Sequence, residues 1–448
     1  MSRSDIRAGH FSLFLRLRCR IHRRFQPATC ATCGVYSTCS SMRYAAFSIS
    51  IVLCCSAVAL LAQQSSSSRY VVTWVGDADR ADSDFLAVVD VALGSKTYGQ
   101  IINTVPAGAI KTIPHHTEQY FFPGHPLFAN GYAGNATFRF DLSDPVHPRL
   151  MGKLSEVPDL AYPHSFARLP NGNVLATMQA KGDDFLPPGG LAEFRDDGSV
   201  VRSASAANDV DPLVRLYNAL VLPEKDRLIV SGGLMTMNDP RVAKRPNDHS
   251  GFTVQLWRLS DLRLLKTIAL PPAPGSRPTA NQDPYEPRLL KNGEVMLSTG
   301  YGGLYHVTGF DADTFKADFV FDFGGSSGVP VIVDRFWIQP VSGLRRVVAV
   351  DVSNPAKPVE LSRIQFDDRQ VAHWLSADPF SDRIIMANSS GEPRLWMLKF
   401  DPISGLVSID TTFHEPGDDR HPGISFDHEV WPHGKTGTGV PHGSVFVN

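Results

Sequence analysis

A strand–turn–strand unit recurs along the chain and limits its possible folds more than any other feature. The two most similar copies are FDLSDPVHPRLMGKL, from Phe140, and VDVSNPAKPVELSRI, from Val350. Each is typical of a β-strand, an Asp, a tight turn containing Pro and a second strand. Looser copies begin at Val89, Phe194, Trp257, Phe310 and Phe400. Successive copies start 40 to 63 residues apart, a spacing that indicates the blades of a β-propeller.

A second kind of hairpin precedes several of these units. Its copies begin at His164, Asn218, Glu286 and His373, and each reads as a strand, a polar turn and a β-rich strand. Together the two hairpins give four strands per unit. We therefore predict an all-β fold, a seven-bladed β-propeller with four-stranded blades over residues 69–448. A stack of β-sandwich domains, the alternative, would not produce this regular order of hairpins. The terminal SVFVN could close the ring beside the first blade and leave no open edge.

The N-terminal 62 residues differ from the rest. The run Ala45–Ala62 is apolar, Met42 and Arg43 precede it, and QQSSSS follows. This pattern predicts a secretory signal peptide that is cleaved after about Ala62. We expect translation to start at Met42, which makes residues 1–62 a basic upstream segment plus a signal peptide. The mature protein would be periplasmic or secreted, with no stable membrane association. An uncleaved N-terminal anchor is the alternative.

Composition narrows the chemistry of the propeller. All six cysteines lie within the first 55 residues, so the propeller has no thiol nucleophile, disulfide framework or thiolate metal ligand. The formal net charge is −2, and no basic stripe with interleaved aromatic residues is present. These features argue against a nucleic-acid partner and favour a small-molecule substrate.

Polar residues open the strands that are expected to line the central channel. These residues are far apart in sequence, but the inner strands of a propeller converge on its axis, so we expect them to be neighbours: His115, His116, His164, Asn218, Glu286 and His373. A single histidine at a strand end is usually capped or solvent-facing. Several at equivalent blade positions indicate a divalent metal site. The adjacent pair can share one metal only if the backbone leaves regular strand geometry there, which Pro114 makes feasible.

The ligand types suggest which metal binds. Imidazoles without thiolates, in an oxidising compartment, favour copper, with zinc or iron next. Glu286 is the candidate catalytic acid or base. Its alternative role is a channel-lining acid paired with an Arg or Lys.

Three motifs carry a resemblance to a known family. They are PHH (Pro114–His116), PHSFARLPNGNVLATM from Pro163 and DHEVWPHG from Asp427. Together with the DxSxPxxP turn, they resemble the selenium-binding protein / methanethiol oxidase family. The resemblance implies a seven-bladed propeller with histidine-bound copper. It also implies oxidation of a small thiol, methanethiol, with oxygen and water to formaldehyde, hydrogen sulfide and hydrogen peroxide. The ligands carried over are His115, His116, His164 and His428. His373 is added from blade geometry.

Two departures from the family and two other functions stay open. The propeller lacks the cysteine through which animal members bind selenium, and HHTEQYFF replaces the family's tryptophan-containing segment. A calcium-dependent lactonase-like hydrolase could use Glu286 and Asn218, although calcium prefers oxygen ligands. A non-enzymatic propeller that binds metal or selenium is the other alternative. His433 and His442 could cover the channel mouth or be solvent-exposed, and the oligomeric state is not predicted.

Overall fold

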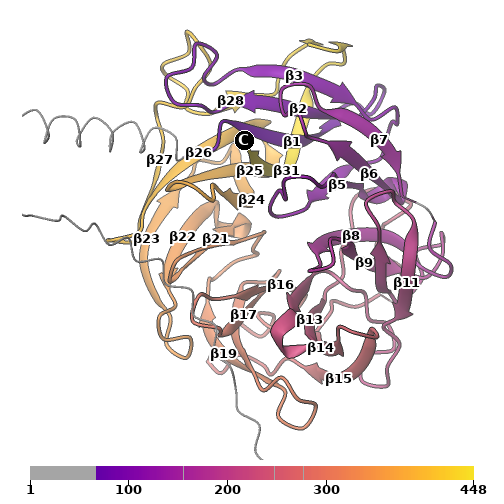
Figure 1. Cartoon of the computed structure of the whole chain (residues 1–448). Helices are drawn as coiled ribbons and strands as arrows, with labels where there is room; N and C mark the ends of the chain where they lie inside the picture. The colour runs from indigo at the N-terminus through magenta and orange to yellow at the C-terminus, as the bar shows by residue number, and fades with distance from the viewer. Residues whose placement is uncertain (1–66, 155, 247, 276) are drawn as a thin grey trace, which may run out of the picture. The chain divides into compact units, whose positions relative to one another are not determined.

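A computed structural model describes residues 67–154, 156–246, 248–275 and 277–448. This part of the chain forms seven radial sheets arranged in a ring (Figure 1). Each blade contains four antiparallel strands. In six blades the four strands are consecutive in the chain, and in the first blade the three N-terminal strands pair with the last strand of the chain. The predicted all-β, seven-bladed propeller is therefore confirmed. The predicted leader over residues 1–62, with its start at Met42, lies outside the described residues.

The first three blades contain the N-terminal strands. In the first blade, β1 (Tyr70–Asp77), β2 (Phe85–Asp90) and β3 (Ile101–Pro106) join the last strand, β31 (Gly439–Val447). The second blade consists of β4 (Pro114–Thr117), β5 (Leu127–Gly131), β6 (Ala136–Asp141) and β7 (Arg149–Lys153). The third consists of β8 (Ala161–Arg168), β9 (Val174–Ala180), β10 (Gly190–Phe194) and β11 (Val200–Ser205).

The remaining four blades follow the same plan. The fourth has β12 (Ala219–Leu222), β13 (Arg227–Gly232), β14 (Thr253–Arg258) and β15 (Arg263–Ala269). The fifth has β16 (Pro284–Leu289), β17 (Val295–Thr299), β18 (Gly303–Thr308) and β19 (Lys316–Asp322). The sixth has β20 (Val331–Val333), β21 (Phe336–Val341), β22 (Arg346–Asp351) and β23 (Val359–Gln365). The seventh has β24 (Gln370–Ala377), β25 (Arg383–Gly391), β26 (Arg394–Asp401) and β27 (Leu406–Ile409).

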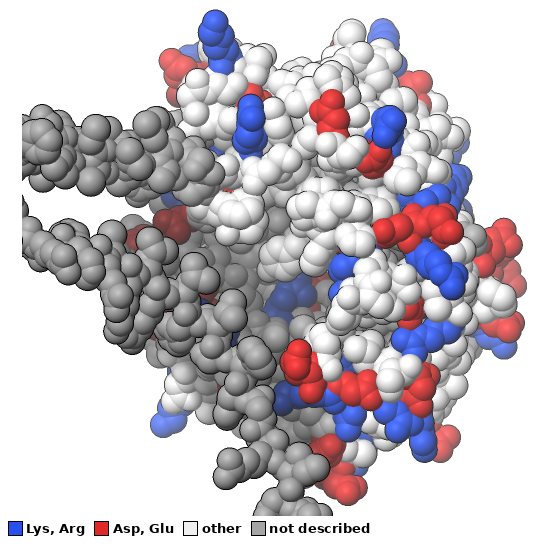
Figure 2. Space-filling model, in the orientation of Figure 1, with Lys and Arg blue, Asp and Glu red and all other residues white. Residues whose placement is uncertain are grey.

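Short elements complete the structure. The strand β28 (Ile424–Ser425) pairs with β26, and β29 (Val430–Trp431) pairs with β30 (Gly434–Lys435). Three 3-10 turns connect strands within blades. Two of them, η1 (Tyr132–Gly134) and η3 (Ser342–Leu344), join the second and third strands of the second and sixth blades, and η2 (Pro223–Lys225) joins the first and second strands of the fourth blade. Among the described residues, no helix has the length and hydropathy needed to cross a membrane. Figure 2 shows acidic and basic side chains interspersed over the face in view.

Burial along the strands explains their sequence patterns. The middle strands are covered on both faces by neighbouring blades, so β2 (FLAVVD) and β9 (VLATMQA) are buried at every position. The outermost strands have one face in water, so β11 (VVRSAS) and β23 (VELSRIQ) alternate between more and less buried positions. The core is therefore a series of apolar layers between adjacent blades, and the channel-facing ends of the inner strands are left for polar residues.

Strand β31 closes the ring. It pairs antiparallel with β1, with Tyr70 opposite Val447 and Thr73 opposite Ser444, and in Figure 1 the yellow end of the chain lies beside indigo β1. The predicted closure by SVFVN is confirmed, and the pairing continues back to Gly439. The start of the ring is also fastened to the seventh blade, because the Ser68 hydroxyl donates to Asp378 at 2.7 Å.

A core substitution in β31 should destabilise the whole ring. Phe446 is 5% exposed and packs between the first and seventh blades. We expect Phe446→Ala to lower the free energy of unfolding by about 3–5 kcal/mol, as measured by urea denaturation. Val440→Ala, at a 38% exposed site in the same strand, should cost only about 0.5 kcal/mol. Equal losses from the two variants would contradict a role for Phe446 in closure.

Candidate metal centre

Five histidines from four inner strands lie close together. His115 and His116 come from β4, His164 from β8, His373 from β24 and His442 from β31. The ring centroids of His115 and His116 are 4.2 Å apart, and those of His116 and His164 are 4.4 Å apart. The ring centroid of His442 lies 4.2 Å from that of His115 and 4.9 Å from that of His373. We call these five residues the histidine cluster.

An extra residue in β4 turns both histidines of the PHH motif toward the channel. Pro114 pairs with Gly131, but Thr117 pairs with Ala129, so β4 has one more residue than β5 over this stretch. Such a bulge breaks the alternation that would send adjacent side chains to opposite faces. The backbone N–H of His116 donates instead to the Asn130 side chain at 2.6 Å. The departure from regular strand geometry, which is the condition for both histidines to face one metal, is therefore present.

The other strands of the cluster bulge at the same point. Register shifts occur at His164 in β8, at His373 in β24 and beside His442, where β31 pairs with β1. His164 and His442 each follow a proline, which has no N–H to contribute to a regular ladder. In each of the four strands that carry the cluster, a bulge therefore accompanies one or two of its imidazoles.

The free nitrogens of the cluster converge. The Nε2 atoms of His115, His116, His164 and His373 are buried and have no hydrogen-bond partner in the protein. Ligand atoms of His115, His116 and His373 all lie within 4.8 Å of one another. Buried polar atoms are normally satisfied. Several unpartnered imidazole nitrogens at one point therefore fit a bound metal ion.

Most of these rings are oriented through their other nitrogen. His164 Nδ1 lies 2.9 Å from the carbonyl oxygen of Tyr217. A carbonyl can only accept, so Nδ1 donates and the Nε2 lone pair is left free for a metal. His115 Nδ1 contacts His442 Nε2 at 3.0 Å, and His116 Nδ1 contacts the Ser165 hydroxyl at 2.9 Å. Partners of this kind commonly fix the tautomer and orientation of metal-binding histidines.

Burial keeps the imidazoles uncharged. It lowers the pKa of His164 to about 3 and that of His373 to about 4. For His115, His116 and His442, burial also lowers the pKa well below the usual value, and charge repulsion from neighbouring imidazoles adds to the effect. Neutral imidazole is the form that binds metal, so the metal-free cluster keeps its lone pairs available through the neutral range.

A cavity of about 200 Å³ adjoins the cluster at His116. Its lining includes apolar side chains such as Trp374 and Val329 and polar ones such as Asn218, Glu286 and Arg288. Glu286 is fully buried and accepts from Asn218 Nδ2 at 2.5 Å. Arg288 Nη2 lies 2.7 Å from the same oxygen, Glu286 Oε2. The structure therefore brings Glu286 and Asn218 to the channel as predicted, and the alternative pairing of Glu286 with an arginine is also present.

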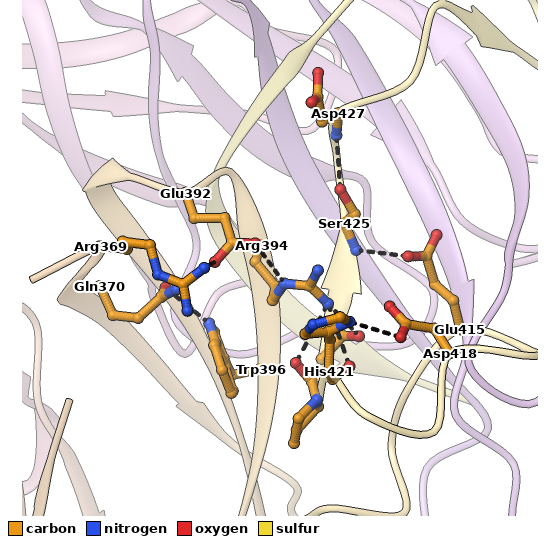
Figure 3. Close-up of polar contacts among 12 residues, drawn as sticks. Arg369, Gln370, Glu392, Arg394, Trp396, Glu415, Asp418, His421, Ser425 and Asp427 are labelled. Atoms are coloured by element: carbon orange, nitrogen blue, oxygen red, sulfur yellow. Dashed lines mark hydrogen bonds and ion pairs between the residues drawn. The ribbon is translucent and has the colours of Figure 1, made fainter. Parts of the chain in front are cut away.

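His428 is not part of the cluster. Its Nε2 lies 3.0 Å from the carbonyl oxygen of Ser425 and 3.3 Å from Glu415 Oε1, and the side chain is 38% exposed. Because the Ser425 carbonyl only accepts, this nitrogen carries a hydrogen. The tail before His428 is held to the seventh blade, because Arg394 donates to the Gly423 carbonyl at 3.0 Å. Figure 3 shows Arg394 beside His421 of this tail. The motif-based placement of His428 with the other four ligands does not agree with this geometry.

His442 takes the place expected of His428. It is 8% exposed and contacts three other histidines of the cluster. His433 lies elsewhere: its Nδ1 is 2.6 Å from the Thr104 hydroxyl. The signal for His442 was present in the sequence as Pro441–His442, a repeat of the Pro–His pairs that begin at Pro114 and Pro163.

Fold and site together define a seven-bladed β-propeller with a buried polyhistidine centre on its axis. A methanethiol oxidase from Ruegeria pomeroyi is 27% identical over 334 residues, 65% of this chain and 71% of that protein. A methanethiol oxidase from a Hyphomicrobium species is 27% identical over 226 residues, 46% of this chain and 49% of that protein. The chain is therefore similar in sequence to proteins named methanethiol oxidase and in fold to a selenium-binding protein, in agreement with the resemblance that its motifs carry.

Solved structures share the fold. A hypothetical selenium-binding protein from Sulfolobus tokodaii superposes with a TM-score of 0.69 at 15% identity, over 86% of this chain and 94% of that one. A periplasmic gluconolactonase from Pseudomonas aeruginosa has a TM-score of 0.56 at 14% identity, over 85% and 99%. At these identities the likeness concerns the fold alone. No protein-family model matches the chain.

The depressed histidine pKa values predict acid lability of the metal-free protein. Below pH 6.5 the histidines of the unfolded chain become protonated, whereas those of the folded cluster stay neutral. The free energy of unfolding therefore decreases as the pH drops toward 4. We expect His373 alone to account for about 2 kcal/mol between pH 7 and pH 5. Urea titrations should therefore show a shallower pH dependence for His373→Gln than for the wild type. His147→Gln, at an exposed histidine, should match the wild type, and identical slopes for all three proteins would refute the prediction.

Proposed function

We propose that this protein is a copper-dependent oxidase of a small thiol, similar to methanethiol oxidase. The reaction would convert methanethiol, oxygen and water to formaldehyde, hydrogen sulfide and hydrogen peroxide. The observation that carries the proposal is the convergence of unpartnered, neutral imidazole nitrogens beside a small cavity. The names of the curated relatives support the choice of substrate. The proposal also includes export of the chain from a start at Met42.

The ligands would be His115, His116, His164 and His373. All four can offer Nε2, and imidazoles without thiolates suit copper. His442 would act behind them, since its Nε2 contacts the Nδ1 of His115. When bound, copper would supply the redox chemistry that links the thiol sulfur to oxygen. The five imidazoles would hold no net charge of their own, so the site would carry the full charge of the ion and favour a thiolate.

The cavity would set the size and polarity of the substrate. Its volume of about 200 Å³ and its apolar wall at Val329 and Trp374 suit a small, uncharged carbon group next to His116. Trp374 is held in place because its indole N–H donates to the Ser444 carbonyl at 2.9 Å. The ring of Trp374 lies 5.0 Å from that of His116. The same residue would therefore position both a ligand and the substrate.

Metal content and thiol oxidation in matched histidine variants test this function. We expect the wild type to bind copper and to consume oxygen with methanethiol. His116→Gln should lower copper occupancy and oxygen uptake at least tenfold, because an amide is a poor substitute for the imidazole ligand. His428→Gln should keep both, because His428 lies outside the cluster.

Other metals point to other functions. Calcium in the isolated protein, together with lactone hydrolysis, would favour a lactonase-like hydrolase and contradict the thiol oxidase. Copper that is bound and spectroscopically visible, without thiol-dependent oxygen uptake, would instead favour a propeller that binds metal without catalysis. Loss of copper on substitution of His428 rather than His116 would show that the ligand assignment is wrong.

A further inference from the structure

The ion pair at the channel leaves one polar atom of each partner unused. Arg288 Nη2 and Glu286 Oε2 are 2.7 Å apart. The other carboxylate oxygen, Glu286 Oε1, and the remaining nitrogen on that side of the guanidinium, Arg288 Nε, are both buried without a hydrogen-bond partner. Each unused atom is bonded through a single carbon to the atom already in contact, and both residues line the same cavity.

These two atoms have complementary hydrogen-bonding requirements. Arg288 Nε–H can only donate, and Glu286 Oε1, as a carboxylate oxygen, can only accept. Leaving both unsatisfied in a buried site is costly. A molecule that accepts from the first and donates to the second satisfies both, and water does so in a minimum of space.

The surrounding contacts fix the carboxylate in place. Asn218 donates to Oε2 at 2.5 Å, and Arg288 Nη2 also donates to the Gln119 side chain at 3.1 Å. Both partners line the same cavity as His116. Burial raises the pKa of Glu286 while Arg288 opposes the shift, so the group is a stronger base than an exposed glutamate.

We propose that Glu286 Oε1 and Arg288 Nε bind the water that is consumed in the reaction, with Glu286 as its general base. This inference rests on the proposed thiol oxidation. That oxidation removes two electrons and two protons from methanethiol, reduces oxygen to hydrogen peroxide and leaves a thiocarbonyl compound, whose carbon is open to attack. Water must then add to that carbon. The Glu286–Arg288 pair lines the cavity and has the unpartnered acceptor and donor that can bind this water.

The proton balance of the hydrolysis can be followed atom by atom. The water oxygen forms a bond to the thiocarbonyl carbon, its proton passes to Glu286, and the carbon–sulfur π electrons move to sulfur. Glu286 then returns the proton to sulfur. In the second stage Glu286 takes the new hydroxyl proton as the carbonyl forms and the carbon–sulfur bond breaks, and the leaving sulfur receives that proton. The products are formaldehyde and hydrogen sulfide, and Glu286 is again an unprotonated carboxylate. Arg288 is a positioning residue.

A structural test does not depend on turnover. A high-resolution crystal structure of the metal-free protein should show an ordered water within about 2.7–3.2 Å of both Glu286 Oε1 and Arg288 Nε. In the structure of Glu286→Ala, no ordered water should occupy that position. If protein groups fill both hydrogen-bonding positions, or the cavity wall between the two atoms holds no ordered water, the proposal is overturned.

A kinetic test separates oxidation from hydrolysis. With copper-loaded Glu286→Gln and methanethiol, we expect the first turnover to produce peroxide at close to the wild-type rate. Formaldehyde and sulfide release should be slower by about 10²–10⁴-fold, because a general base has been removed. Glu294→Gln, at a partly exposed glutamate bonded to His306, is the matched control and should behave as wild type. Equal effects on peroxide and formaldehyde, or no effect on either, would overturn the assignment. A wild type that forms neither product would instead count against the thiol oxidase itself.

Discussion

The pairing of β31 with β1 is the contact on which the rest of the structure depends. It joins residues 70–77 to residues 439–447 and converts an open row of blades into a ring. A ring has no exposed sheet edge, which removes the main liability of an all-β chain. The same strand carries His442 and brings it to 3.0 Å from His115 on the neighbouring blade. Closure of the fold and assembly of the candidate metal centre are therefore one event.

The electrostatics of the channel follow a simple division. The imidazoles are buried without acidic partners, which lowers their pKa values and keeps them neutral. The buried carboxylates are paired with arginines, as in Glu118 with Arg168 at 2.9 Å, where burial still raises the pKa of Glu118 to about 7. The charges at the cavity wall are thus balanced by protein groups, whereas the neutral histidine cluster is free to bind a cation.

Much of this architecture could be predicted from the sequence because its signals are local. A strand, a turn with Pro and a second strand recur along the chain, and burial between blades requires such strands to be apolar. His115, His116, His164 and His373 were predictable because the repeated hairpin places each on an inner strand, although His164 and His373 lie within β8 and β24 and not at their starts as expected. The bulges beside these histidines depend on pairing with the next strand. The only local sign of such bulges is the proline that precedes His115, His164 and also His442.

The residues that were misplaced share one physical reason. His428 and His442 both stand in a glycine-rich tail with no clear strand period, so their position depends on tertiary contacts. His428 lies in a motif that resembles the family, yet hydrogen bonds hold it near Ser425 and Glu415. His442 belongs to the closing strand, whose role as the innermost strand of the first blade follows from ring closure. Arg288 was missed because nothing local shows that a strand arginine faces the channel.

The place of His442 in the closing strand also sets an order of events in biosynthesis. During synthesis, the first blade lacks its innermost strand until residues 439–447 have been made and have paired with β1. Until then His115 lacks its hydrogen-bonding partner His442 on β31, and the histidine cluster of a nascent chain is incomplete. The fold therefore delays assembly of the complete histidine cluster until β31 has been made and has paired with β1.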